Sequence, residues 1–387
     1  PVLLEIAISD VRAARVAVRS RAHAPAAERL AESRLLPGVA IQMLTSGTTG
    51  TPKRVPLSER ALAHSLLGAK HYEREKAEAP RLRTGVAILA SPLVHVSGIF
   101  RVLQCATDGR PFALLDRFRV EPWRDLVVRH RPRTASLVPT ALRMVLDAKL
   151  DRADLASLKA VVSGTAPLAP EDAEAFELQY GVPVLTSYGA TEFAGGVAGW
   201  NLADHAKYRE RRRASVGRAH PGCSLRVVDP ATDRALAPGE EGVLEVRSVQ
   251  LGPDSDWVRT TDRARLDADG FLWILGRADA AILRGGFKVH PEVVVDALEE
   301  HPSVREAAVV GLADARLGHV PVAAVELRAG APRVTGDELR EFARERLTAY
   351  QVPARILVVD ALPRTPSLKP SAPGVRALFE HAEDVAR

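Results

Sequence analysis

The sequence predicts an α/β protein with a large N-terminal domain of sheet and helices, residues 1–278, and a small α+β lid domain at the C-terminus, residues 279–387. Short apolar runs alternate with helical patterns in the first part of the chain, which is typical of an α/β sheet. A charged, glycine-containing segment at Leu275–Gly286 then precedes a compact unit of about a hundred residues. The length of 387 residues also exceeds one ordinary core.

The elements of the first domain are predicted from their apolar periodicity. Residues 39–44 form an apolar run that we expect to be a buried strand, and it ends in a loop rich in glycine and threonine. A helix follows from about Ser58, which can serve as its N-cap, to about Lys76. Further strands are predicted at 86–90, 157–163, 182–187 and 243–246.

The second domain begins with a helix at Pro291. Proline suits the first helical position and Glu292 suits the first turn. A second helix is predicted at about 336–347. The apolar runs at 307–311, 320–327 and 356–359 are predicted strands.

Composition narrows the class of protein. Hydrophobic residues make up 46% and charged residues 26% of the chain, the mixture of a soluble globular protein. Cys105 and Cys223 are far apart and in no metal-ligand spacing, which favours a reducing cytoplasm. The net charge is +5, but the dense arginine run at 209–213 has no interleaved aromatics and is expected to be a solvated face rather than a nucleic-acid site. No apolar run approaches the ~20 residues of a transmembrane helix.

The loop at Thr45–Lys53 carries the most chemical information. Its glycines let backbone N–H groups approach an anion, its hydroxyls donate further hydrogen bonds, and its lysine adds a charge, which suits a polyphosphate. It is not a Walker A loop, because Thr51 and Pro52 separate Gly50 from the lysine. The expected phosphate contacts are Thr45, Ser46, Gly47, Thr48, Thr49, Gly50 and Lys53.

This loop resembles the phosphate loop of the adenylate-forming, AMP-binding superfamily of acyl- and aryl-CoA ligases, peptide-synthetase adenylation domains and luciferases. Within it, the fatty-acid and acyl-CoA ligases are the most similar in character. Arg54 stands where the family usually has glycine. The resemblance spans about Gly38 to Leu378, and only 44 residues precede Thr45, so the large domain is expected either to be naturally shortened at its N-terminus or to have segments outside this sequence.

Two more motifs of the resemblance concern the nucleotide. Tyr188–Glu192 matches the family motif Tyr-Gly-x-Thr-Glu. It implies that the tyrosine stacks on adenine, that Thr191 contacts phosphate, and that Glu192 binds Mg²⁺, which prefers oxygen ligands. Residues 163–168 are similar to the segment that packs on the adenine ring. The nucleotide contacts implied here are Gly164, Thr165, Ala166, Pro167, Tyr188 and Gly189.

Other segments supply the ribose site, the acyl pocket and the hinge. Arg259–Asp262 is similar to the family's Arg-Thr-Gly-Asp, with threonine replacing glycine, and Asp262 would accept hydrogen bonds from the ribose hydroxyls. Arg277 is implied to contact ribose and phosphate, and Asp279 to be the hinge. Residues 92–98 resemble the segment whose histidine lines the acyl pocket, which implicates His95 together with Gly189.

The last motif is Leu362–Lys369. In the family a mobile lysine sits near the C-terminus, commonly after glycine; here Leu368 replaces that glycine and Pro370 follows. The resemblance still implies that Lys369 is the mobile lysine. The glycine pair Gly285–Gly286 is implied to line a tunnel for the thiol.

The resemblance implies an ATP-dependent ligase that works in two half-reactions with domain alternation. A carboxylate and ATP give an acyl-adenylate and pyrophosphate, with Mg²⁺ and with Lys369, Glu192, Lys53 and Thr191 as catalytic residues. The acyl group then passes to coenzyme A. Two alternatives stay open: an enzyme that loads a carrier protein's phosphopantetheine thiol, and a degenerate nucleotide-binding protein. The acid and the oligomeric state, a homodimer included, also stay open.

Overall fold

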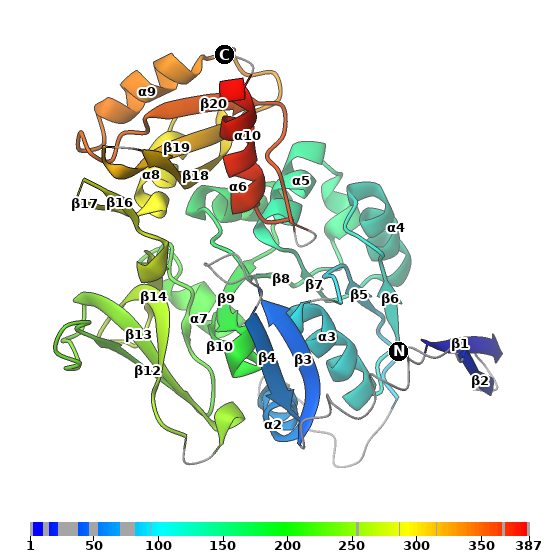
Figure 1. The fold of residues 1–387 in the computed structure, drawn as a ribbon. Coiled ribbons are helices and arrows are strands. Elements are labelled where there is room, and N and C mark those ends of the chain that lie inside the picture. The colour runs from blue at the N-terminus through cyan, green and yellow to red at the C-terminus, as the bar shows by residue number, and fades with distance from the viewer. Residues whose placement is uncertain are drawn as a thin grey trace.

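The computed structural model describes residues 3–10, 15–21, 38–45, 53–69, 82–93, 95–252, 255–285, 287–314, 316–365 and 368–384. These residues form a large N-terminal part and a small C-terminal domain, as the sequence predicts (Figure 1). The C-terminal domain, yellow to red in Figure 1, contacts the large domain along helix α5 (Pro139–Ala148). The first described strands, β1 (Leu3–Asp10) and β2 (Arg15–Arg21), pair with each other.

A parallel sheet forms the centre of the large domain. The strands β7, β8 and β9 run parallel, and β10 and β11 extend the sheet in antiparallel fashion. A second parallel pair, β5 and β6, contacts β7. The bounds are β5 Ala87–Leu89, β6 Phe112–Leu114, β7 Thr134–Ser136, β8 Ala160–Ser163, β9 Val184–Ala190, β10 Gly195–Gly199 and β11 Arg218–Ala219. The predicted strands at 86–90, 157–163 and 182–187 are therefore confirmed as β5, β8 and β9.

Helices cover this sheet and make its main core. Trp123, Val127, Leu142 and Phe176 are almost fully buried there, packed with residues of β7, β8 and β9. Proline begins both α5 and α6, where its fixed φ suits a helix start. The bounds are α3 Val96–Thr107, α4 Val120–His130, α6 Pro170–Tyr180 and α7 Leu202–Tyr208.

The predicted strand at 39–44 is one half of a hairpin. It is β3 (Val39–Thr45), and it pairs with β4 (Lys53–Ser58) before α2 (Glu59–Ala69). The expectation of a fully buried strand is wrong, because Ala40 and Gln42 are exposed while Met43 is buried. The strand alternates because only one face packs on the core, as is common for antiparallel strands. Ser58 caps the helix, since its hydroxyl accepts the N–H of Ala61 at 3.1 Å; the predicted helix end near Lys76 lies outside the described residues.

A second, antiparallel sheet follows in the order β12-β13-β14-β15. On its inner face, Leu244 and Leu272 pack against Phe193, in the turn after β9, and Val197 of β10. The predicted strand at 243–246 is the middle of β13. The bounds are β12 Cys223–Val228, β13 Glu241–Ser248, β14 Val258–Leu266 and β15 Leu272–Arg277.

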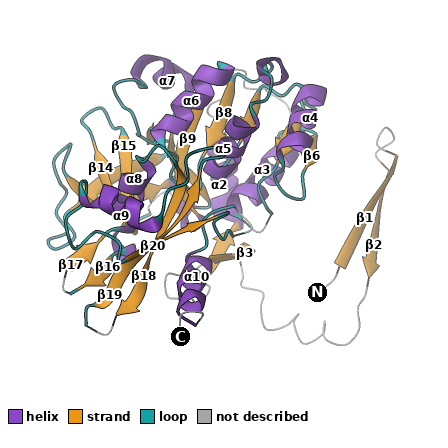
Figure 2. Ribbon diagram, turned by 90° about the horizontal axis from the view of Figure 1, so that it is seen from above, coloured by secondary structure: helices purple, strands orange, loops and turns teal. Residues whose placement is uncertain are grey.

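The C-terminal domain is a sheet with helices on both faces (Figure 2). Helices α8 and α9 pack on one face through Val294, Leu298 and Leu339, and α10 packs on the other through Val375 and Phe379. Strand β19 is central, antiparallel to β18 and parallel to β20. The bounds are β16 Ile282–Arg284, β17 Phe287–Val289, β18 Val304–Asp314, β19 Gly318–Leu327, β20 Arg355–Val359, α8 Pro291–Glu299, α9 Gly336–Arg344 and α10 Ala372–Asp384. All the helices and strands predicted for this domain are confirmed.

The arginine run at 209–213 pairs with carboxylates of the same chain. Arg212 lies 2.7 Å from Asp267, and Arg213 lies 2.6 Å from Glu174. Cys105 and Cys223 are both free thiols. No helix in the described ranges is long and apolar enough to cross a bilayer.

Candidate functional site

The predicted phosphate loop joins the two strands of the first hairpin. Thr45 and Lys53 are paired across it at the ends of β3 and β4. Residues 46–52, which include Ser46, Gly47, Thr48, Thr49 and Gly50, lie outside the described residues. Strand β4, which follows the loop in the chain, contacts the 3₁₀ turn Thr191–Phe193.

The carboxyl ends of the parallel strands bring together the predicted adenine segments. Gly164 directly follows β8, and a Cβ there would lie 2.6 Å from Ser187 Oγ on β9, so only glycine fits this close approach. Thr165 has φ +72°, Thr165 and Pro167 are exposed, and Ala166 is half-buried. The crevice outside the carboxyl ends of such strands is where open α/β sheets bind ligands.

Tyr188, Asp262 and Arg277 meet where β9 approaches the antiparallel sheet. Tyr188 donates its hydroxyl hydrogen bond to Asp262, and burial together with that carboxylate raises the pKa of the tyrosine. Asp262 and Arg277 are register partners on β14 and β15. A hydrogen bond to Asp279 raises the pKa of Arg277 most, and the charges of Asp262 and Glu192 add to this. The predicted site residues Tyr188, Asp262, Arg277 and Asp279 thus form a chain of neighbours.

Gly189 is needed for the backbone geometry beside Tyr188. It faces Gly196 in the β9–β10 pair, and a Cβ on Gly189 would lie 2.3 Å from the carbonyl oxygen of Gly195. Glu192 is exposed at the turn after β9. A water-accessible carboxylate fits Mg²⁺, which usually binds one or two carboxylates plus substrate phosphates.

Lys369 reaches the large domain from the C-terminal domain. Burial lowers its pKa, and no attraction from a described carboxylate offsets that effect. The pKa of His95 is lowered by burial and then by the charge of Lys369, which places the two side chains near each other. His95 Nε2 is buried and has no hydrogen-bond partner among the described residues. A cation and an imidazole nitrogen without described partners mark a site for an anionic, oxygen-bearing ligand.

The predicted hinge residue Asp279 and the glycine Gly285 lie in the segment between β15 and β17. Arg277 forms two hydrogen bonds with Asp279, of 2.8 and 2.7 Å, in the 3₁₀ turn Ala278–Ala280 that joins the domains. Gly285 has φ +54°, and its N–H donates to the carbonyl of Leu317 within the C-terminal domain. Gly286 lies outside the described residues.

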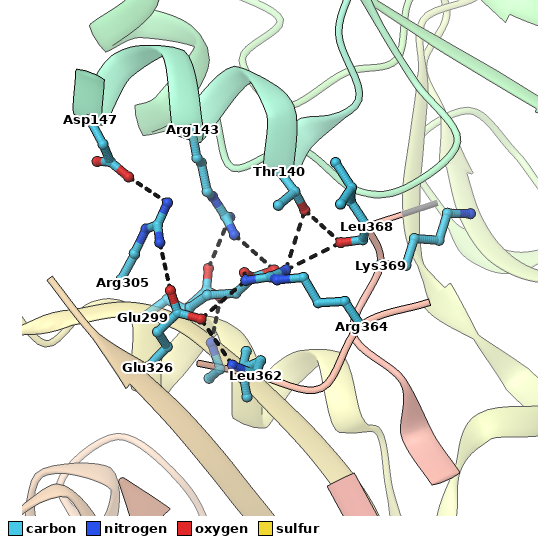
Figure 3. A network of polar contacts seen from close by, with 12 residues as sticks. Thr140, Arg143, Asp147, Glu299, Arg305, Glu326, Leu362, Arg364, Leu368 and Lys369 are labelled. Carbon is cyan, nitrogen blue, oxygen red and sulfur yellow. Dashed lines mark hydrogen bonds and ion pairs between the residues drawn. The ribbon is translucent and has the colours of Figure 1, made fainter. Parts of the chain in front are cut away.

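An ion-pair network between the domains is a feature that the sequence did not reveal (Figure 3). Arg143 of α5 lies 2.5 Å from Asp172 of the same domain, and 3.6 and 3.1 Å from Glu299 and Glu306 of the C-terminal domain. Arg305 pairs with Asp147 across the interface. Arg364 was within reach of prediction, because it belongs to the quoted lysine motif, but nothing in the sequence around Arg143 distinguishes it from other helical arginines.

The lysine motif itself is held by this interface. Arg364 pairs with Glu306 at 2.6 Å and with Glu326 at 3.1 Å. The hydroxyl of Thr140 on α5 donates to the carbonyl of Leu368 at 3.0 Å. Figure 3 shows the Lys369 side chain turned away from the ion pairs. The network therefore fixes the backbone on which Lys369 is carried and leaves its ammonium unengaged by the carboxylates drawn there.

Comparison with known proteins agrees with this geometry. The family model for AMP-binding enzymes matches residues 8–253, and the model for the AMP-binding enzyme C-terminal domain matches residues 296–369. The chain belongs to the AMP-binding enzyme family. The predicted resemblance and the predicted fold class are thereby confirmed.

Curated relatives of this AMP-binding enzyme carry the names of CoA ligases. The chain is 34% identical to 4-coumarate–CoA ligase-like 9 of Oryza sativa subsp. japonica over 84% of its own length and 61% of that protein. It is 32% identical to indoleacetate–CoA ligase of Aromatoleum aromaticum over 86% of its own length and 66% of that protein. The chain thus spans less than two thirds of the length of these relatives.

A solved relative shows the ligands of the family. The o-succinylbenzoate coenzyme A synthetase of Bacillus subtilis, in complex with ATP and a magnesium ion, superposes with a TM-score of 0.68 at 27% identity. The match covers 85% of this chain and 68% of that one.

Proposed function

We propose that this chain is an AMP-forming acid–thiol ligase. It would join a carboxylic acid to ATP as an acyl-adenylate, release pyrophosphate, and then transfer the acyl group to coenzyme A. One observation carries the proposal: the half-buried Lys369 of the C-terminal domain is close enough to His95 for its charge to lower the pKa of that imidazole, and Leu368 beside it packs on the large domain. The names of the curated relatives support the same reaction class.

The first half-reaction needs positive charge where negative charge grows. The acid's carboxylate attacks the α-phosphorus of ATP, the bond to the bridging oxygen breaks, and pyrophosphate leaves. Lys369 would contact both the carboxylate and the α-phosphate, because its ammonium is already desolvated and acts strongly in a site that excludes water. Glu192 would hold Mg²⁺, which supplies further charge to the phosphates.

The nucleotide would be held by the residues already described. Asp262 would accept the ribose hydroxyls, Tyr188 and the segment from Gly164 would contact adenine, and Thr191 would contact phosphate. We keep the loop from Thr45 to Lys53 as the proposed β,γ-phosphate site, on the strength of its sequence and of the contact between β4 and the turn that carries Glu192.

The second half-reaction would require a rotation of the C-terminal domain. The turn at Asp279 is the proposed pivot and the boundary between the two domains. Rotation would withdraw Lys369 and bring the hairpin with Gly285 and Gly286 toward the acyl-adenylate, a hinge movement of the kind that completes many catalytic sites. The thiol of coenzyme A would then attack the acyl carbon and AMP would leave.

Acid-dependent exchange of labelled pyrophosphate into ATP tests the adenylation step. The panel should include aryl acids of the 4-coumarate and indoleacetate type, which the relatives' names suggest, and fatty acids. We expect exchange with at least one class; no exchange with any acid would favour the nucleotide-binding protein. CoA-dependent AMP release without a carrier protein would support the CoA ligase, and dependence on a carrier protein would support the alternative acceptor.

Substitution of the lysine tests its role. Lys369→Ala should lower adenylation by about 10²–10³-fold, the scale for losing one charge-stabilising contact, and should spare thioester formation from pre-made acyl-adenylate. Lys159→Ala, at an exposed lysine, is the matched control and should change neither step. Equal losses in both half-reactions would contradict the assignment. The cytoplasmic location and a homodimer stay predictions.

A further inference from the structure

Leu368, the residue before Lys369, has an unusual backbone conformation. Its φ is +65°, in the left-handed region that favours glycine and disfavours side chains with a Cβ. The family commonly has glycine next to the lysine, whereas this chain has a branched apolar residue. A leucine in this conformation persists only where its surroundings compensate for the strain.

The side chain of Leu368 supplies that compensation by crossing the domain interface. It packs against the main core of the large domain, although it belongs to the C-terminal domain. It lines a small cavity at the carboxyl ends of β5 and β7, with Ala90, Pro92, Phe118 and Val138 among the other lining residues. These four lining residues are apolar, whereas Ser91, Arg117 and Ser136 add polar groups to the same cavity.

The backbone of Leu368 is held from the polar side as well. Its carbonyl accepts hydrogen bonds from Thr140 at 3.0 Å and from Arg364 at 3.2 Å. Its N–H donates to Thr365 within the loop at 2.9 Å. Side chain and carbonyl are thus both fixed, and one of the two residues that hold the carbonyl belongs to the large domain.

We propose that Leu368 is a positioning residue that anchors the lysine loop in the large domain during adenylation. Its side chain lines the cavity, and the hydrogen bonds to its carbonyl fix the backbone from which Lys369 extends. The inference rests on the proposed adenylation. It adds to that proposal a residue that acts by positioning the lysine rather than by touching the substrate. Because the C-terminal domain must withdraw for thioester formation, the same anchor favours the first half-reaction over the second.

Three substitutions of Leu368 separate the side chain from the backbone. Leu368→Ala keeps the strained conformation and removes most apolar contact; we expect adenylation to fall about tenfold in kcat, with the KM for ATP little changed. Leu368→Met replaces leucine with an unbranched apolar side chain of similar size, so the apolar contact is largely kept and most of the adenylation activity should remain. Leu368→Gly removes both the apolar contact and the backbone strain, so its adenylation rate should lie between those of Leu368→Ala and the wild type.

Thioester formation and a control variant test whether Leu368 acts only in adenylation. Thioester formation from pre-made acyl-adenylate should be unchanged or faster in Leu368→Ala. Leu178→Ala, on the exposed surface of α6, should behave as wild type in both steps. Wild-type adenylation by Leu368→Ala, failure of methionine to restore it, or equal loss in both half-reactions would overturn the proposal.

Hydrogen–deuterium exchange tests the anchor without any acid substrate. The amides of Leu368 and Ser371 are hydrogen-bonded inside the loop, the latter to Pro363 at 2.7 Å. They should exchange faster in Leu368→Ala than in the wild type and in Leu178→Ala. This readout stands even if no acid supports pyrophosphate exchange, so it separates failure of the anchor from failure of the proposed function; unchanged protection would refute the anchor.

Discussion

Glu299 should make the stability of this protein depend on pH near neutrality. Its carboxylate lies at the domain interface, where burial raises its pKa from 4.5 to about 7. The attraction of Arg143 and the hydrogen bond from the Ala307 N–H act in the opposite direction, and the nearby charges of Glu306 and Asp172 reinforce the rise. The folded protein therefore binds a proton that the unfolded chain has already released.

The sign and size of the pH effect on stability follow from the linkage between proton binding and folding. Between about pH 4.5 and pH 7 the folded state holds more protons than the unfolded state, so stability falls as pH rises. The pKa of Glu299 is about 7 in the folded protein and 4.5 as the ordinary value. At about 1.36 kcal/mol per pKa unit, this difference of about 2.5 lowers the free energy of unfolding by about 3 kcal/mol by pH 8. Glu299→Gln removes this ionisation. We expect the free energy of unfolding of the variant, relative to wild type, to rise by about 2–3 kcal/mol from pH 5 to pH 8.

Urea denaturation at a series of pH values measures this difference. Because the chain has two domains, the midpoint should be followed by both fluorescence and circular dichroism. Glu300→Gln is the matched control: it removes a carboxylate next to Glu299 that is exposed to water, and its curve should run parallel to that of the wild type. A stability difference between Glu299→Gln and wild type that does not change from pH 5 to pH 8 would refute the reasoning.

Three further substitutions test other parts of the site. Arg143→Met leaves three carboxylates without their shared cation and should lower the free energy of unfolding by about 3 kcal/mol, measured by denaturation, with a smaller loss in an Arg143→Met/Glu299→Gln double variant. Asp262→Asn should raise the KM for ATP about tenfold or more and leave the KM for the acid unchanged, because bonds to charged groups contribute about 1.5–3 kcal/mol. Gly189→Ala should lower the melting temperature by several degrees, since its methyl group would meet a backbone carbonyl at 2.3 Å.

The parts of the fold that were predicted correctly have strong local signals. The C-terminal domain followed from three apolar runs and a Pro-Glu helix start, and the capping box of Thr335 and Glu338 confirms that its second helix also begins on local chemistry. The strand at 39–44 was misjudged because a short apolar run does not reveal whether one or both of its faces are covered. Ala40 and Gln42 are exposed because only one face of β3 packs on the core, and the sequence did not indicate that β3 pairs with β4 in a hairpin.

The residues of the site also divide into those that the sequence named and those that it did not. Tyr188, Asp262 and Arg277 lie in three separate segments, yet motif resemblance named each of them, and the structure makes them neighbours. Thr140 and Arg143 could not be named in advance. Their importance depends on which face of α5 meets the C-terminal domain, and that is set by tertiary packing rather than by helical periodicity.

The charge balance of the interface suits a contact that must be broken and re-formed. Three arginines, Arg143, Arg305 and Arg364, share five carboxylates: Asp147, Asp172, Glu299, Glu306 and Glu326. A protonated Glu299 reduces the negative excess, so docking of the domains is favoured at low pH and weakens as that proton leaves. Leu368 adds an apolar contact that does not titrate. The proposed second half-reaction includes a rotation of the C-terminal domain. An interface with complete charge compensation would oppose that rotation, whereas a negative excess together with the apolar contact of Leu368 would hold Lys369 in place for adenylation and still allow its release.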